Sequence, residues 1–167
     1  MRIGTVTLRV RDLNAVSSFY QRVLGLTPVA ESEGSVTLSA NGTPMVRLHG
    51  DPALSPRDLR QAGLFHTAFL MPSRADLGRW LSYVRSAGIQ LQGASDHIVS
   101  EALYLSDPEG NGIEVYADRP VSRWRDQAGN IQMTTERLDV EDLLKAADGT
   151  DWAGFRAFPV RWSPFSQ

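Results

Sequence analysis

The chain has 167 residues, of which 42% are hydrophobic and 22% are charged, and its formal net charge is −2. This composition is typical of one globular domain that can bury a core, and without a basic cluster it gives no reason to propose nucleic acid or an anionic membrane as a partner. The absence of cysteine excludes disulfides and thiolate metal sites, and no apolar run approaches the ~20 residues that span a bilayer, so we expect a soluble, cytoplasmic protein.

Residues 3–49 predict one strand, one helix and three further strands. Residues 3–10 alternate between apolar and polar side chains, as a half-buried strand does. Asp12 can cap the helix that follows, whose apolar residues recur every three or four positions until Gly25 ends it. Turn signals then separate three short strands, which we expect near residues 27–31, 35–39 and 45–49.

The same order of elements recurs over residues 63–118, after a polar connection that contains proline. LFHTAFLM is predicted to form a strand, Ser73 opens a helix, and Gly88 ends this helix as Gly25 ended the first. Strands are expected near residues 90–98, 101–106 and 112–118. Two β-α-β-β-β units predict an α+β fold in which helices cover one face of a curved mixed sheet and the other face forms a cup.

Strand parity predicts which side chains point into this cup. Phe65 and Phe69 of LFHTAFLM are expected beneath the second helix, so His66 faces the other way, and Thr5 holds the same position in the first repeat. Glu114 lies in the middle of the last strand, where a carboxylate is costly to bury without a partner. An imidazole and a carboxylate on adjacent strands can bind a divalent metal. The alternatives are a structural histidine and a polar strand face that simply meets solvent.

Residues 96–120, DHIVSEALYLSDPEGNGIEVYADRP, predict two strands joined by a tight turn, in which Gly110 and Gly112 are free to take a positive φ. Together with IGTVTLRVRDLNAVSSFYQRVLGL and GLFHTAFLMPSRADL, this segment resembles the vicinal oxygen chelate superfamily (glyoxalase I, bleomycin-resistance proteins, extradiol dioxygenases), and within it the catechol 2,3-dioxygenase-like proteins. The resemblance covers residues 3–120. It implies paired β-α-β-β-β units that form a cup around a divalent metal, commonly Fe(II) in the dioxygenases.

The resemblance also implies the metal ligands. His66 matches a histidine ligand of the family and Glu114 its carboxylate ligand, whereas Thr5 stands where the other histidine is usual. Because a hydroxyl is a weak, neutral ligand, we expect Fe(II) to be held less tightly, with manganese, zinc or an empty site as alternatives. If Arg47 turns inward, its guanidinium repels a cation and can pair with Glu114 instead.

The activity that the resemblance implies is ring cleavage of a catechol-like substrate. His97 would take or return a proton, since imidazole titrates near neutral pH, and Tyr104 would hydrogen-bond the substrate. The alternatives are a core aromatic for Tyr104 and an exposed loop residue for His97, while His49 is expected at the surface. Two other functions stay open: a metal-free small-molecule binding module, which Thr5 and Arg47 favour, and a non-catalytic half of a two-module dioxygenase. Cup-forming proteins frequently dimerise, so we expect a homodimer.

These patterns divide the chain into a module over residues 1–120, with repeats over 3–49 and 63–118, and a C-terminal extension over 121–167. In the extension, DVEDLLKAA predicts a short amphipathic helix, and the aromatic-rich tail carries two Trp and three Phe in its last seventeen residues. Because these rings are costly to expose, we expect the tail to cover its own cup or a neighbouring subunit. The alternative is a disordered tail that results from truncation or a shifted reading frame.

Overall fold

The computed structural model describes residues 4–58, 60 and 63–154. The chain forms two compact units, the first made of residues 1–63, 107–111 and 153–167, and the second of residues 64–106 and 112–152. Each unit contains a mixed β-sheet with a helix packed on it, so the predicted α+β fold is confirmed. None of the helices in the described ranges has the length and apolar character needed to cross a membrane.

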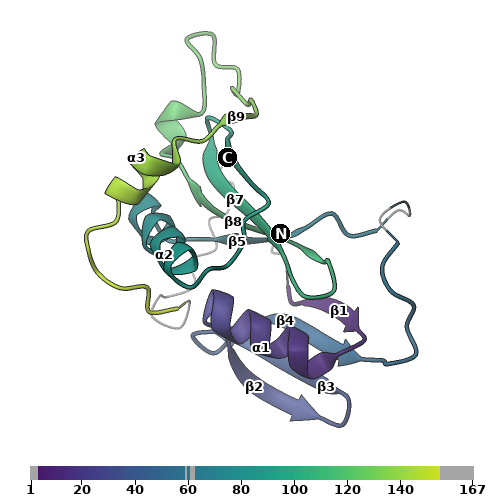
Figure 1. Ribbon diagram of the computed structural model, residues 1–167. Coiled ribbons are helices and arrows are strands. Elements are labelled where there is room, and N and C mark those ends of the chain that lie inside the picture. Colours follow the sequence, from purple (N-terminus) through teal and green to yellow (C-terminus); the bar gives the residue numbers. More distant parts are fainter. Residues whose placement is uncertain (1–3, 59, 61–62, 155–167) are drawn as a thin grey trace. The chain divides into compact units, whose positions relative to one another are not determined.

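The first unit has its elements in the predicted order: β1 (Val6–Val10), α1 (Leu13–Leu24), β2 (Thr27–Ser32), β3 (Ser35–Ala40) and β4 (Thr43–Gly50). Its sheet has the strand order β1-β4-β3-β2, in which only the β1–β4 pair is parallel. Helix α1 lies across one face of this sheet (Figure 1). The buried residues Leu8, Leu38 and Leu48 form the core under the helix.

Both ends of α1 follow the sequence prediction. The Asp12 carboxylate accepts a hydrogen bond from the backbone N–H of Ala15 at 2.9 Å, and Gly25 ends the helix with φ of 66°. The turn of residues 107–111 belongs to this unit, and its Glu109 carboxylate accepts hydrogen bonds from the backbone N–H groups of Arg11 and Asp12. The start of α1 is therefore held by carboxylates from two distant parts of the chain.

The second unit adds elements that the sequence did not predict. It contains β5 (Thr67–Leu70), α2 (Arg74–Ser86), β6 (Gly93–Asp96), β7 (Ser100–Ser106), β8 (Gly112–Asp118), η1 (Val121–Arg123), β9 (Glu136–Arg137) and α3 (Val140–Lys145). The strand order is β5-β8-β7-β6-β9, with β5 parallel to β8. The short strand β9 and the turn η1 are the new elements, whereas α3 falls within the predicted DVEDLLKAA helix.

The second sheet has one apolar and one polar face. Phe69, Ile113 and Val115 are buried on the face that α2 covers with Trp80, as parity predicted. The expectation for Phe65 is wrong, because β5 begins only at Thr67, and the Phe65 ring ahead of the strand is 82% exposed.

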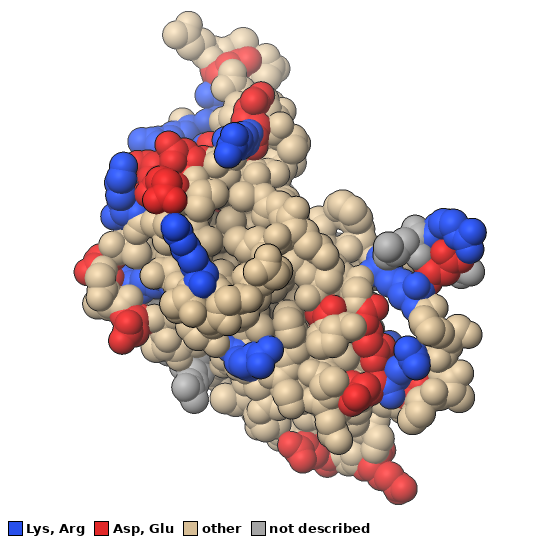
Figure 2. All heavy atoms as spheres, viewed as in Figure 1, with Lys and Arg blue, Asp and Glu red and all other residues tan. Residues whose placement is uncertain are grey.

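Helix α3 packs on α2 through apolar and ionic contacts. Leu143 is fully buried, and Arg74 binds Asp142 at 2.8 Å while Arg85 binds Glu141 at 3.2 Å. Figure 2 shows basic and acidic side chains intermingled over these two helices. Residues 121–152 of the C-terminal extension are thus an integral part of the second unit.

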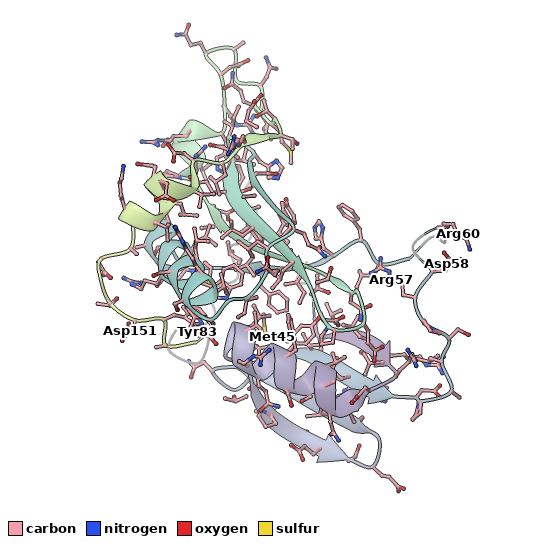
Figure 3. All side chains as sticks on the ribbon, viewed as in Figure 1. Met45, Arg57, Asp58, Arg60, Tyr83 and Asp151 are labelled. Carbon is pink, nitrogen blue, oxygen red and sulfur yellow. The ribbon has the colours of Figure 1, made fainter. Side chains whose placement is uncertain are left out.

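The long connection between β4 and β5 carries several charged side chains. Arg57, Asp58 and Arg60 lie along it, as Figure 3 shows. The Asp58 carboxylate pairs with Arg60 at 3.1 Å, and the Arg57 guanidinium donates a hydrogen bond to the Gly110 carbonyl. The Arg57 contact ties this connection to the turn of residues 107–111 within the first unit.

Candidate functional site

The structure brings His66 and Glu114 together on the polar face of the second sheet. His66 directly precedes β5, and Glu114 lies in the middle of β8, the parallel neighbour of β5. His66 Nε2 lies 2.8 Å from Glu114 Oε2, and the two side chains are 27% and 14% exposed. The imidazole and the carboxylate therefore meet at a place that is largely, but not fully, shielded from water.

Tyr104 and His97 extend this pair into a chain of hydrogen bonds. Tyr104 lies opposite Glu114 in the β7–β8 pair, and its hydroxyl donates to Glu114 Oε1 at 2.9 Å. His97 Nε2 lies 2.9 Å from the same hydroxyl, while His97 Nδ1 donates to the backbone carbonyl of Thr134 at 2.7 Å. We call the four side chains of His66, Glu114, Tyr104 and His97 the polar network.

The tyrosines of this face are neutral hydrogen-bonding groups at physiological pH. Burial, and then the hydrogen bond and charge of Glu114, raise the pKa of Tyr104 above its ordinary value. Burial, with the carboxylates of Asp118 and Glu114, raises the pKa of Tyr116 to about 12. Tyr104 therefore enters the polar network as a phenol that donates a hydrogen bond, and not as an anionic ligand.

Gly112 determines how closely His66 approaches β8. Of the two turn glycines, Gly110 takes a positive φ of 83°, whereas Gly112 does not. A Cβ at Gly112 would lie 2.1 Å from the Phe65 carbonyl oxygen and 3.2 Å from His66 Cα. The missing side chain thus makes room for the segment that carries His66.

The turn that carries His97 is braced by an ion pair. The two terminal nitrogens of the Arg119 guanidinium, Nη1 and Nη2, each donate a hydrogen bond to the Asp96 carboxylate at 2.6 Å. This hydrogen bonding holds the pKa of Asp96 below its ordinary value. The Asp96 carboxylate also accepts from the backbone N–H of Ile98, which has a φ of 68° that is strained for a β-branched residue. Arg119 further contacts the buried Glu101 at 3.1 Å. His97 therefore projects from a firmly held turn.

Three other residues of the sequence analysis lie in the first unit. Thr5 is exposed just ahead of β1. Arg47 lies on the sheet face opposite the α1 core, where its Nε donates to the Thr37 hydroxyl at 3.3 Å. His49 is exposed near the end of β4, as expected.

The second unit offers two side chains that can act as ligands of a divalent metal ion. His66 supplies an imidazole nitrogen and Glu114 a carboxylate oxygen, which are ligands of Fe(II), Mn(II) and Zn(II) alike. Throughout the described ranges, no group of three His, Cys, Asp or Glu side chains is placed to hold a metal. Thr5, the third expected ligand, belongs to the first unit, so the second unit by itself offers one imidazole and one carboxylate, a weaker donor set than two histidines and a carboxylate.

Some residues of the site escaped the sequence analysis. Thr134 contributes only its backbone carbonyl to the polar network, and a backbone atom leaves no signal in the residue type. Gly112 was recognised but assigned to the turn, because a close approach by another segment cannot be read from a local pattern. For Phe65, the signal was present in the apolar alternation, but the strand begins at Thr67, three residues later than predicted.

Comparison with known proteins places the chain among dioxygenases and related proteins. Residues 2–115 match the Glyoxalase/Bleomycin resistance protein/Dioxygenase superfamily. The chain is 42% identical over 148 residues to catechol-2,3-dioxygenase of Bacillus subtilis (strain 168), covering 87% of this chain and 52% of that protein. It is 32% identical over 120 residues to biphenyl-2,3-diol 1,2-dioxygenase 3 of Rhodococcus globerulus, covering 70% of this chain and 63% of that protein. The chain thus spans between half and two thirds of these curated relatives.

Solved structures show the same fold. A glyoxalase/dioxygenase from Nostoc punctiforme matches with a TM-score of 0.61 and 22% identity, over 71% of this chain and 92% of that one. Lactoylglutathione lyase from Agrobacterium tumefaciens matches with a TM-score of 0.56 and 24% identity, over 70% of this chain and 92% of that one. The chain therefore belongs to the Glyoxalase/Bleomycin resistance protein/Dioxygenase superfamily.

Proposed function

We propose that this chain is an extradiol-dioxygenase-like protein that binds a catechol-like substrate at the polar network. The observation that carries the proposal is the 2.8 Å contact between His66 and Glu114, with the Tyr104 hydroxyl on the second carboxylate oxygen. The 42% identity to a catechol-2,3-dioxygenase supports the substrate class. Because the chain covers 52% of that relative, the activity of the whole relative is carried over only as a proposal.

In this proposal, His66 and Glu114 hold a divalent ion, with Fe(II) as the first choice and Mn(II) or Zn(II) as alternatives. Such an ion, when bound, supplies a Lewis acid for the two adjacent oxygens of a catechol. The network around it then has to orient the diol and accept its proton.

Tyr104 and His97 are suited to these two tasks. The raised pKa keeps the Tyr104 phenol protonated, so it can donate a hydrogen bond to a substrate oxygen in place of Glu114. His97 is anchored through Nδ1 to the Thr134 carbonyl, which leaves Nε2 directed at the site. A ring nitrogen held in this way can take a proton from a substrate hydroxyl and return it later.

Metal analysis and oxygen uptake test the proposal. Purified protein, loaded anaerobically with Fe(II) and freed of excess metal, is expected to retain iron and to consume dioxygen when catechol is added. His66→Ala should abolish iron retention and oxygen uptake, whereas the exposed His49→Ala should leave both unchanged. Absence of iron and of oxygen uptake in the wild-type chain would refute the enzymatic assignment.

A metal-free binding module is the second candidate. It is favoured by the direct hydrogen bonding within the network, in which Glu114 is satisfied by His66 and Tyr104 without a metal. Calorimetric titration of metal-free protein with catechol distinguishes the two functions, because only the binding module retains full affinity without metal. The remaining alternative, a non-catalytic half of a two-module dioxygenase, predicts neither iron-dependent oxygen uptake nor catechol binding by this chain.

A further inference from the structure

Phe65 is an exposed aromatic ring beside the polar network. It is 82% exposed, more than any other large hydrophobic side chain in the described ranges. Its place immediately before His66 puts it beside the candidate site. A phenylalanine that contributes nothing to the core of its own unit, and stands next to converging polar groups, is a candidate for contact with a ligand.

The Phe65 ring contacts the His66 ring, which in turn contacts the Tyr104 ring. The Phe65 and His66 ring centroids are 4.8 Å apart with a tilt of 48°, and those of His66 and Tyr104 are 5.9 Å apart with a tilt of 54°. Both separations lie in the range in which aromatic rings attract one another. This series of rings therefore runs from an apolar, water-exposed ring to the hydroxyl and carboxylate of the network.

The main chain holds Phe65 in place. Its carbonyl oxygen lies so close to Gly112 that a Cβ there would come within 2.1 Å. On the other side along the chain, His66 is bound by Glu114. Because both the backbone and the next side chain are anchored, the point from which the ring projects is fixed, and mainly the rotation of the side chain itself remains to be lost on binding.

We propose that Phe65 is a specificity-determining residue, whose ring packs against the aromatic ring of a diol bound by the polar network. This inference rests on the proposed function and deepens it. An aromatic diol has two adjacent hydroxyls for Tyr104, His97 and the His66–Glu114 pair, and an apolar ring that must also be covered. Phe65 supplies that cover, and an aliphatic diol with the same two hydroxyls cannot stack on it.

Titration calorimetry on the full chain, under anaerobic conditions, tests the inference with two probes. The wild-type protein is expected to bind catechol more tightly than cyclohexane-1,2-diol. Phe65→Ala should weaken catechol binding about tenfold and leave the aliphatic diol nearly unaffected, because stacking accounts for the difference. Phe65→Leu, which keeps apolar area but no aromatic face, should fall between the two. The matched control is Val121→Ala, another exposed apolar residue of the second unit, which should not change either affinity.

The outcomes separate this inference from the proposed function. If wild-type protein binds catechol and both Phe65 variants bind it equally well, Phe65 has no such role, while the proposed function stands. An equal loss for the two diols would also overturn the inference, because it would indicate a general disturbance of the site. If the wild-type chain binds no catechol with or without Fe(II), the proposed function itself fails.

Discussion

Gly112 is the residue on which the position of His66 most directly depends. Gly112→Ala would place a Cβ 2.1 Å from the Phe65 carbonyl oxygen, so the segment ahead of β5 must move away from β8. We expect the free energy of unfolding to fall by about 1–3 kcal/mol, the usual cost of overpacking, and catechol binding to weaken. Urea denaturation and calorimetric titration measure the two effects.

Gly93→Ala is the matched control for this substitution. A Cβ at Gly93 in β6 would lie 3.6 Å from the nearest atom, the Tyr104 Cδ2, which is an ordinary contact. We expect the stability and the ligand affinity of this variant to stay close to those of the wild type. Equal behaviour of the two variants would mean that the close approach at Gly112 does not position His66.

The Asp96–Arg119 pair makes the free energy of unfolding depend on pH in the acidic range. Because the pKa of Asp96 is lowered from 3.8 in the folded state, its ionised form stabilises the protein above about pH 4, and this contribution is lost as the pH falls below that value. Asp96→Asn should therefore be less stable than the wild type by about 0.5–1 kcal/mol at pH 7, with the gap narrowing as the pH falls below 3.8. Urea denaturation across this range tests the prediction, and a gap independent of pH would contradict it.

Among the elements, α2 and α3 meet at a glycine. In an exposed helix, Gly→Ala stabilises by about 1 kcal/mol, but a Cβ at Gly78 would lie 2.6 Å from the Leu143 carbonyl oxygen. We therefore expect Gly78→Ala to have the opposite sign and to lower the free energy of unfolding by about 1–3 kcal/mol. Protease cleavage near α3 should also become faster, because the helix can no longer dock fully.

Ser82→Ala, at an exposed position of the same helix, is the control for Gly78→Ala. Here the substitution has no neighbouring element to displace, so only the helix propensity of the two residues matters. We expect a change within about 0.5 kcal/mol and no faster cleavage near α3. A stabilising effect of Gly78→Ala would show that α3 does not depend on this close contact.

The elements themselves were predictable where their signals are local. The caps of α1 and α2, at Asp12 and Ser73, were assigned correctly because a capping side chain reaches only a few residues along the chain. Strand β9 was missed, since its two residues carry no period of their own and depend on pairing with β6. The late start of β5 has a similar cause, because the length of a strand depends on its neighbour.

For the whole molecule, the described end of the chain contributes to the first unit. The backbone at Gly154 packs so closely on the end of α1 that a Cβ there would lie 3.1 Å from Gly25 Cα. A chain truncated after residue 150 should therefore unfold at a lower urea concentration than the full chain. Sedimentation of the full and the truncated chain tests the expected homodimer. If truncation changes neither the urea midpoint nor the mass in solution, the tail has no covering role. Residues 155–167 of that tail lie outside the described residues.

The division into a module over residues 1–120 and an extension over 121–167 stays a prediction. The two compact units follow different boundaries, because the turn of residues 107–111 groups with the first unit and residues 112–152 with the second. Such a grouping joins segments that are distant in sequence. Composition and periodicity therefore carry no trace of it.

Sequence alone was sufficient for the order of the elements within the two β-α-β-β-β repeats, for the helix caps and for the face on which Glu114 lies. These depend on repeats of two and 3.6 residues and on neighbours along the chain. The distance from His66 to Glu114, the Thr134 carbonyl on His97 and the exposure of Phe65 came only from the folded chain. Each of these depends on the pairing or packing of segments that are far apart in sequence, and such contacts are set by the register and ends of strands, which no local pattern encodes.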